Sequence, residues 1–157
     1  MHLQNNAGKN NHKRLLIDLI GKCDSAILCS GWLKLAGVQA LLPAIDAALE
    51  RGARIELYSN RAQTPDDVLA ALATRQALAH RIVDDTRRHL HTKLYYFQTA
   101  DLYTAVIGSA NITIGGLRDN EELSIVHSGT VGDATFVQVR QYLQDLAALK
   151  FVTAARR

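Results

Sequence analysis

The first half of the chain alternates between two hydrophobic periodicities. Apolar residues recur at helical spacing over residues 12–20 and again over residues 38–49, which predicts two amphipathic helices. A short apolar run follows each of these segments, at residues 25–30 and 53–59, and each run predicts a strand. This alternation of helices and strands indicates an α/β architecture in which helices pack on a sheet.

Two prolines refine the helical pattern. Pro43 lies inside the second helical stripe, so that helix either starts late or is kinked at this residue. The run Thr64-Pro65-Asp66-Asp67 predicts the start of a third helix. Here a capping hydroxyl precedes a proline at the first helical position, and two acids follow at the positive end of the helix dipole. We expect this helix to end near residues 76–78.

The second half of the chain is richer in strands. Residues 81–83, 89–98, 102–109 and 120–127 have the composition of β-strands. Only three residues separate the second of these segments from the third, so the two should form a hairpin. A hairpin combined with the strand and helix alternation of the first half predicts a mixed sheet.

The two ends of the chain differ in their patterns. Apolar residues from Phe136 to Leu146 repeat at spacings of 3, 4 and 3, which predicts a final helix packed on the sheet. Residues 1–11 show no periodicity and predict a flexible tail. We therefore expect a single α/β domain over residues 12–157, with a mixed β-sheet flanked by helices on both faces.

Composition narrows the class of protein without identifying a function. With 157 residues, 48% of them hydrophobic and 21% charged, the chain has the make-up of an ordinary globular domain. A net charge of +3 permits a polyanionic partner but does not require one. We expect no membrane span and no signal peptide. Cys23 and Cys29 match no metal or redox spacing, so we expect free thiols in a reducing cytoplasm.

Candidate chemistry is concentrated after residue 90. His91 and Lys93 are two residues apart on a predicted strand, so both side chains should face the same side. Ser109 and Asn111 are also two apart, at the end of the neighbouring strand of the hairpin. These groups suit a phosphodiester, because an ammonium, a hydroxyl and an amide can hold its oxygens while an imidazole acts as nucleophile or general acid.

A carboxylate can complete this arrangement. Glu122 lies on the following predicted strand, where it can accept an imidazole N–H and fix the tautomer of the ring. Glu121 points to the opposite face and is the alternative. Neither Cys nor a carboxylate lies at ligand spacing beside His89 and His91, so we expect no metal site.

Four further residues are candidates for substrate binding. Arg87 and Arg88 directly precede the motif, and they either form a solvated turn or follow a phosphate backbone. Trp32 follows the first predicted strand and either packs at the rim of the core or stacks on a base. Arg118 comes shortly after the motif and is a candidate for lining the cleft.

The order of these residues carries a family resemblance. The runs His91-Thr92-Lys93, Gly108-Ser109-Ala110-Asn111 and Asn120-Glu121-Glu122 resemble the signature of the phospholipase D superfamily, H-x-K-x4-D followed by G-S-x-N. The chain is most similar to the nuclease and restriction-endonuclease branch, and the resemblance is specific over residues 89–126. The family's Asp, generally regarded as structural, is Gln98 here.

The resemblance implies a mechanism that needs two copies of the motif. One His attacks phosphorus and forms a phosphohistidine, while the other protonates the leaving oxygen and then activates water. This sequence holds one copy, so we expect a homodimer with the active site at its two-fold interface. Two copies of Lys93 would supply the charge that a metal supplies elsewhere, so we expect no cofactor.

We therefore expect a metal-independent phosphodiesterase, and more specifically an endonuclease that acts on DNA. The stretch of residues 81–93 contains four Lys or Arg against two Asp, which favours nucleic acid as substrate. Three alternatives remain open. They are a phospholipid phosphodiesterase, a non-catalytic nucleic-acid-binding module, and a nuclease subunit of a larger assembly directed by a partner such as an ATPase or translocase.

Overall fold

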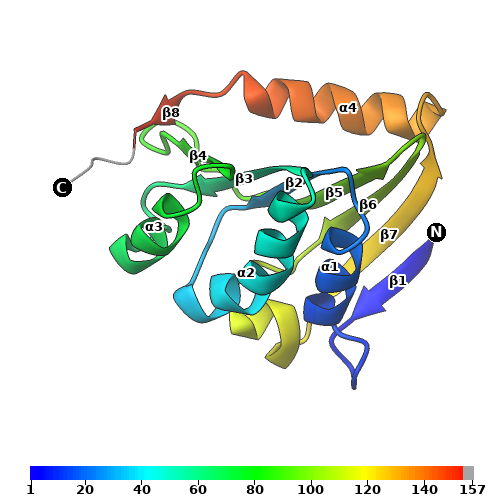
Figure 1. Ribbon diagram of the computed structural model, residues 1–157, viewed down its shortest axis with the longest axis horizontal. Helices are drawn as coiled ribbons and strands as arrows, with labels where there is room; N and C mark the ends of the chain where they lie inside the picture. Colours follow the sequence, from blue (N-terminus) through cyan, green and yellow to red (C-terminus); the bar gives the residue numbers. More distant parts are fainter. Residues whose placement is uncertain (154–157) are drawn as a thin grey trace.

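One mixed sheet organises the molecule. The computed structural model describes residues 1–153, and in that part of the chain eight strands lie in the order β1-β7-β6-β5-β2-β3-β4-β8 (Figure 1). The strands are β1 (His2–Asn5), β2 (Ser25–Ser30), β3 (Arg54–Asn60), β4 (Ala79–Val83), β5 (Lys93–Thr99), β6 (Leu102–Gly108), β7 (Leu123–Thr130) and β8 (Phe151–Val152).

The parallel ladders lie in one half of this sheet, where β8 adds an antiparallel edge strand to β4, and the ladders of the other half are all antiparallel. β2, β3 and β4 pair in parallel, as expected for strands joined through helices. β5, β6 and β7 are antiparallel neighbours, and β5 with β6 forms the predicted hairpin, from Leu94 opposite Ile107 to Thr99 opposite Leu102. β5 also pairs with β2, which joins the two halves. The mixed sheet predicted from the sequence is confirmed.

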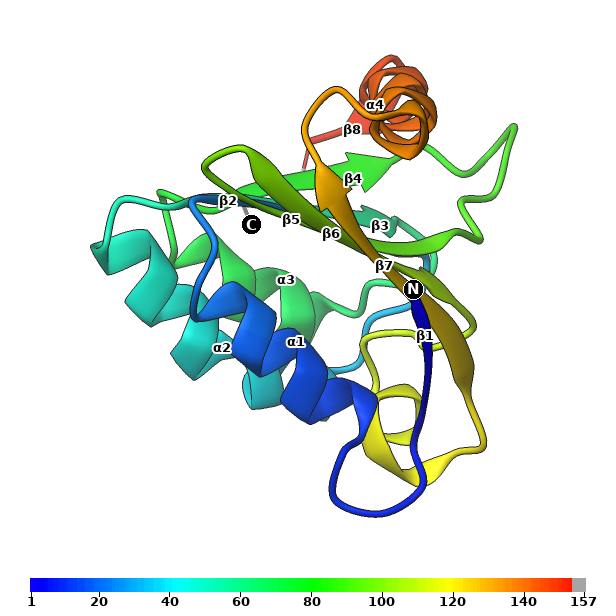
Figure 2. The same ribbon diagram turned by 90° about the vertical axis from the view of Figure 1, so that its right-hand side faces the viewer.

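Helices cover both faces of the sheet, again as predicted. Figure 2 shows α1, α2 and α3 on one face and α4 on the other. The α-helices are α1 (His12–Ile20), α2 (Leu35–Glu50), α3 (Asp66–Ala73) and α4 (Ala134–Ala147), and a short π-helix, η1, spans Gly115–Asp119. None of the helices within residues 1–153 is long and apolar enough to cross a membrane.

Each face of the sheet has its own apolar core. Leu28 and Val106 are fully buried in the layer under α1, α2 and α3. Tyr96, Tyr103 and Leu143 belong to the second layer, under α4, where the two tyrosine rings stack with their centroids 6.0 Å apart. Successive residues of a strand point to opposite faces, so the two cores share the same strands.

The two prolines act differently from one another. α2 begins at Leu35, so Pro43 lies inside the helix and the alternative of a late start is wrong. At α3, Pro65 precedes the helix, but Thr64 is buried and does not cap it. Its hydroxyl donates instead to the Asn60 carbonyl at 2.5 Å. α3 ends at Ala73, three residues or more before the predicted end.

The N-terminal segment corrects an expectation. Residues 1–11 were expected to form a flexible tail, but His2–Asn5 form β1 and pair antiparallel with β7. Asn11 then caps α1 by accepting a hydrogen bond from the Arg14 backbone N–H at 3.1 Å. The exposed edge of β7 supplies the backbone partners for β1, and a sequence pattern gives no sign of such an edge.

Candidate active site

The candidate residues meet where β2 ends and β5 begins. Lys93, the first residue of β5, lies opposite Ser30, the last residue of β2. The segment after β6 reaches the same place, because Ile112 forms a bridge with Leu33 just beyond β2. The neighbouring strand ends therefore bring the two halves of the motif together, as the hairpin predicted. His91 itself precedes β5, so the predicted start of this strand at residue 89 is wrong.

His91 and Lys93 are in direct contact. The Lys93 ammonium donates to the His91 carbonyl at 2.7 Å, and it lies 3.2 Å from each ring nitrogen of the same residue. Lys93 is only 7% exposed, whereas His91 is exposed. Burial lowers the pKa of Lys93, an effect that the negative charge of Glu122 opposes. A bound phosphate would place a negative charge beside this buried ammonium and would favour its protonated form.

Asn111 is oriented by a buried serine. Ser30 is fully buried, and its hydroxyl accepts a hydrogen bond from the Ile112 backbone N–H at 3.0 Å. The same hydroxyl lies 3.3 Å from the side-chain oxygen of Asn111 and 2.8 Å from the Trp32 carbonyl. The hydroxyl has a single proton to share between these two oxygens, and because the Asn111 oxygen faces Ser30, its NH₂ group is available to donate to a ligand.

The backbone around Asn111 has neighbours on both sides. A Cβ atom on Gly116 would lie 2.4 Å from the Asn111 carbonyl oxygen, and one on Gly37 would lie 2.5 Å from that of Ile112. Only glycine fits at such distances. The loop that carries the amide is therefore held between α2 and η1.

A second buried residue holds the segment before His91. Asn60, at the end of β3, accepts a hydrogen bond from the Leu90 N–H at 2.8 Å and donates to the Leu90 carbonyl at 2.5 Å and to the Gly31 carbonyl at 3.1 Å. Leu90 thus has its backbone groups satisfied by a side chain rather than by a strand. Sequence reasoning missed both Asn60 and Ser30. The only indication in the sequence was that each of them is a polar residue at the end of an otherwise apolar strand.

Ser109 and Glu122 pair with each other. The Ser109 hydroxyl donates to the Glu122 carboxylate and accepts from the Leu123 N–H at 3.1 Å. Within this chain, the hydrogen-bond partner of Glu122 is therefore Ser109 and not the His91 imidazole that the sequence analysis expected. The difference follows from position, because both residues lie just outside the ends of the paired strands β6 and β7.

A pocket joins four of the predicted residues, Trp32, His91, Lys93 and Asn111. We call it the central pocket; it has a volume of about 240 Å³ and is lined by Gly31, Trp32, Gln63, His89, His91, Lys93 and Asn111. Trp32, at the edge of this pocket, is 43% exposed, and the Lys34 ammonium lies 4.8 Å from the centroid of the Trp32 ring. Ser109 and Glu122 do not line this pocket.

The predicted arginines are placed differently from one another. Arg87 and Arg88 are exposed on the loop between β4 and β5, just before His91. Arg118 is exposed on η1 and paired with Asp119, with nitrogen to oxygen distances of 2.6 and 3.0 Å. Arg81 is also engaged, by Glu56 at 2.8 Å. Arg87 and Arg88 are thus better placed than Arg118 to reach a ligand at His91.

Other titratable groups lie apart from the central pocket. His12, the first residue of α1, is fully buried, with its Nδ1 2.7 Å from the Asn6 side-chain oxygen and its Nε2 2.8 Å from the Ser124 hydroxyl. Cys23 and Cys29 are free and buried, and burial raises the pKa of Cys29 to about 12. Within residues 1–153, no group of three or more His, Cys, Asp or Glu side chains is arranged to hold a metal ion.

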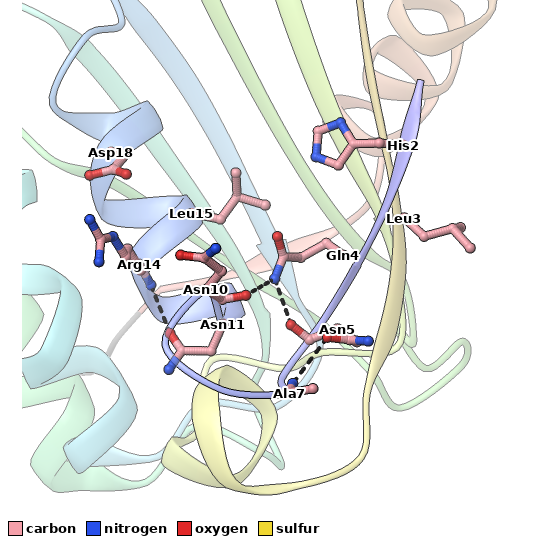
Figure 3. A pocket seen from close by; sticks show the side chains of 10 residues that line it. All are labelled: His2, Leu3, Gln4, Asn5, Ala7, Asn10, Asn11, Arg14, Leu15 and Asp18. Carbon is pink, nitrogen blue, oxygen red and sulfur yellow. Dashed lines mark hydrogen bonds between the residues drawn. The ribbon is translucent and has the colours of Figure 1, made fainter.

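A separate pocket of about 410 Å³ lies between β1 and α1 (Figure 3). Its lining mixes polar and apolar groups and includes Gln4, Asn10, Arg14 and Leu15. Gln4 donates to the Asn10 carbonyl at 2.5 Å, so the hydrogen bonds drawn there join parts of the N-terminal segment itself. The pocket contains none of the predicted site residues.

Gln98 lies at the opposite end of β5 from Lys93. They are five residue steps apart along an extended strand, which is roughly 16 Å. Its side chain accepts a hydrogen bond from the Tyr96 hydroxyl at 2.9 Å and donates to the Ala100 carbonyl at 3.1 Å. The residue at this position therefore supports the β5–β6 turn and does not contact the central pocket.

Comparisons with known proteins agree with this geometry. The family described as "Cardiolipin synthase, PLD-like domain" matches residues 16–147. A comparison with curated protein sequences gives no match. Among solved structures, the fold is similar to that of Nuc, a phospholipase D family member from Salmonella typhimurium, with 15% identity, a TM-score of 0.72, and coverage of 98% of this chain and 97% of that one.

Two further structures show the same fold. NucT from Helicobacter pylori aligns with 15% identity and a TM-score of 0.67, over 96% of this chain and 98% of that one. Phosphatidylserine synthase from Haemophilus influenzae aligns with 14% identity and a TM-score of 0.71, over 96% of this chain but 39% of that one. Together with the family match over residues 16–147, the site geometry leads to one conclusion: the chain belongs to the phospholipase D-like family of phosphodiesterases.

Proposed function

We propose that the chain is a metal-independent endonuclease that hydrolyses DNA through a phosphohistidine intermediate, at an active site completed by a second copy. The convergence of His91, Lys93 and Asn111 on one pocket carries this proposal. An exposed imidazole stands beside a buried ammonium and an oriented amide, and these groups together can attack a phosphodiester and hold its oxygens.

The proposed reaction has two steps. A ring nitrogen of His91 attacks phosphorus, the bond from phosphorus to the leaving oxygen breaks, and the partner subunit's His91 gives that oxygen a proton. In the second step the partner's His91 removes a proton from water, the resulting hydroxide attacks phosphorus, and the bond between nitrogen and phosphorus breaks. Two ammonium groups and two amides around one phosphate stabilise the charge that builds on its oxygens.

An apolar patch beside the site supports the second copy. Leu3, Ile107 and Ile125 are 67%, 46% and 44% exposed, and they lie side by side on β1, β6 and β7, since Ile125 is paired with both of the others. Leu123, 55% exposed, continues the row to Ser109, which accepts a hydrogen bond from its backbone N–H. We call these four residues the sheet patch. A self-complementary contact through this surface buries apolar side chains and closes on a two-fold axis.

DNA is the substrate that the charges favour. Arg87 and Arg88 are exposed immediately before His91, where they can contact phosphates on either side of the cleaved bond. A phospholipid substrate is the second candidate, and the exposed sheet patch is the observation that favours it, because apolar surface can also meet a lipid surface. We place the nuclease in the cytoplasm; a larger assembly in which a partner such as an ATPase or translocase directs the same nuclease activity is the alternative organisation.

The direct test compares substrates in the presence of EDTA. We expect the purified protein to nick plasmid DNA and to leave phosphatidylcholine vesicles intact. His91→Ala should abolish nicking, while His2→Ala, at an exposed histidine on β1, should not change it. Loss of nicking in EDTA that returns with added metal contradicts the metal-free mechanism, and equal nicking by His91→Ala contradicts the assignment of the nucleophile.

A quench experiment tests the intermediate. Acid-free denaturation of the protein during turnover of an oligonucleotide should trap a nucleotide mass on the peptide that contains His91. The same peptide from Lys93→Ala should carry much less of this adduct, because the charge that stabilises it is reduced. An adduct on any other peptide overturns the mechanism.

A further inference from the structure

A second pocket lies directly beside His91, between the loop before β5 and helix α4. We call it the α4 pocket. Its volume is about 590 Å³, within the range of roughly 300–1,000 Å³ that is typical of small-ligand sites. The residues that matter here are Arg88, His89, Leu90, Tyr142, Asp145 and Leu146. The proposed chemistry leaves this pocket without a role.

The α4 pocket and the central pocket share a wall. His89 and His91 line both of them, and their rings lie with centroids 6.4 Å apart at an interplanar angle of 35°. A group bound in the α4 pocket is therefore next to any phosphate held at His91. In a polynucleotide the group in that position is the nucleoside on one side of the cleaved bond.

The lining of the α4 pocket matches the chemistry of a nucleobase. Tyr142 is 39% exposed, and its hydroxyl lies 2.5 Å from that of Thr92, which fixes the ring on the loop. Leu90 and Leu146 form an apolar floor, with exposures of 5% and 2%. A base has apolar faces, which suit a tyrosine ring and leucine side chains.

Polar groups stand around this apolar floor. Arg88, His89 and Asp145 line the same pocket and offer donors and an acceptor for the edge of a base. Asp145 is held by the Gln141 side chain at 3.1 Å. The edge of a heterocycle can hydrogen-bond to these groups whereas an acyl chain cannot, so the mixture of polar rim and apolar floor favours a heterocycle.

We propose that the α4 pocket binds the nucleobase adjacent to the phosphate at His91, with its face against Tyr142. This inference rests on the proposed function and adds to it a substrate class. A base inside a duplex is stacked on both faces and cannot reach such a pocket without leaving the helix. The site therefore takes single-stranded or locally unpaired nucleic acid in preference to an intact duplex.

The test separates the base from the phosphate backbone. Two fluorescently labelled hexamers with the same number of phosphates are compared, hexathymidylate and a fully abasic hexamer. Binding is measured by anisotropy in the His91→Ala background, so that neither is cleaved. We expect hexathymidylate to bind about tenfold or more tightly than the abasic hexamer, which is the usual size of one base stacked on an aromatic ring.

Substitutions at Tyr142 assign that preference to the pocket. Tyr142→Ala should remove most of the tenfold difference, and Tyr142→Phe should keep it, because the ring remains while the hydroxyl is lost. Val137→Ala, at an exposed apolar residue elsewhere on α4, should keep it fully. Circular dichroism and a thermal melt show that each variant is folded.

Each outcome either supports or contradicts the base site. Equal binding of the two hexamers, no binding of either, or a preference that survives Tyr142→Ala overturns the base site. None of these results affects the proposed hydrolysis, because plasmid nicking by the protein and its loss in His91→Ala are scored separately. Loss of the base preference in Tyr142→Phe as well would place the effect in the Thr92 hydrogen bond and would also overturn stacking.

Discussion

Helices cover the two faces of the sheet to different extents. On one face α1, α2 and α3 cover the strands, and residues such as Leu28 and Val106 are fully buried. On the other face α4 covers part of the strands and leaves Ile107 and Ile125 exposed, next to the site. The covered face holds the fold together, and the uncovered part of the opposite face is available to a partner.

The largest effect is expected from a substitution in the sheet patch, on the face that α4 leaves partly uncovered. If the proposed dimer forms through this patch, Ile125→Asp should leave the protein monomeric and lower the proposed DNA hydrolysis by about 10³-fold, since an unpaired charge in an apolar contact costs several kcal/mol. Size-exclusion chromatography with light scattering and a nicking assay measure the two effects. Val137→Asp, at a 58% exposed residue of α4, should change neither. A monomeric wild type, or a dimeric Ile125→Asp variant, contradicts the composite site.

A matched pair of leucines compares the two faces for stability. Leu28→Ala, in the covered core, should lower the free energy of unfolding by about 2–5 kcal/mol, because it leaves a cavity. Leu123→Ala, in the sheet patch, should change it by less than about 0.5 kcal/mol when measured on the monomeric Ile125→Asp background. Urea denaturation provides both values. Similar losses at the two positions would show that the patch belongs to the core of the monomer.

The covered face should also weaken in acid. Burial lowers the pKa of His12, and it lowers that of His80 from 6.5 to about 4. The unfolded chain takes up protons below pH 6.5 that the folded chain binds less well, so stability is lost as the pH falls from 6.5 toward 4. We expect a loss on the order of 2 kcal/mol in urea denaturation, part of which His80→Gln should remove. His2→Gln serves as the control and should retain the full loss.

The smallest expected effect concerns the attachment of α4. Asp133 caps this helix by accepting from the Phe136 N–H at 2.7 Å, and it also accepts from the Tyr103 hydroxyl at 3.0 Å. Asp133→Ala should lower the free energy of unfolding by about 1 kcal/mol, the usual cost of a lost helix cap. Asp18→Ala, in the middle of α1, should cost less in the same thermal or urea measurement. An equal cost at both positions would mean that the cap contributes nothing.

Local patterns were sufficient for the motif and for most elements. Strand periodicity and a three-residue turn placed the two halves of the motif on adjacent strands, and the structure brings His91, Lys93 and Asn111 to one pocket. Residue types alone did not show that His91 lies before the strand. Its segment is fixed by Asn60, a residue about 30 positions earlier, and no local pattern records a contact between such distant residues.

Several features of the site and its surroundings depend on such long-range contacts. Ser30 orients Asn111 across 81 residues of sequence, and β1 exists because β7 offers an open edge. The partnership of Glu122 with Ser109 depends on where two strands stop pairing. Each of these is set by three-dimensional proximity, whereas sequence periodicity reports only which face a residue is on.

The sequence by itself determined the alternation of elements, the mixed sheet and the residue types of the candidate site, because these follow from side-chain period and residue type over a few positions. Tertiary structure decided which apolar strand residues are covered. Ile107 and Val106 are neighbours of similar hydrophobicity, yet one is 46% exposed and the other is fully buried. The difference arises because a helix packs over one face at that point and not over the other. The local spacing of apolar residues does not specify how distant elements pack.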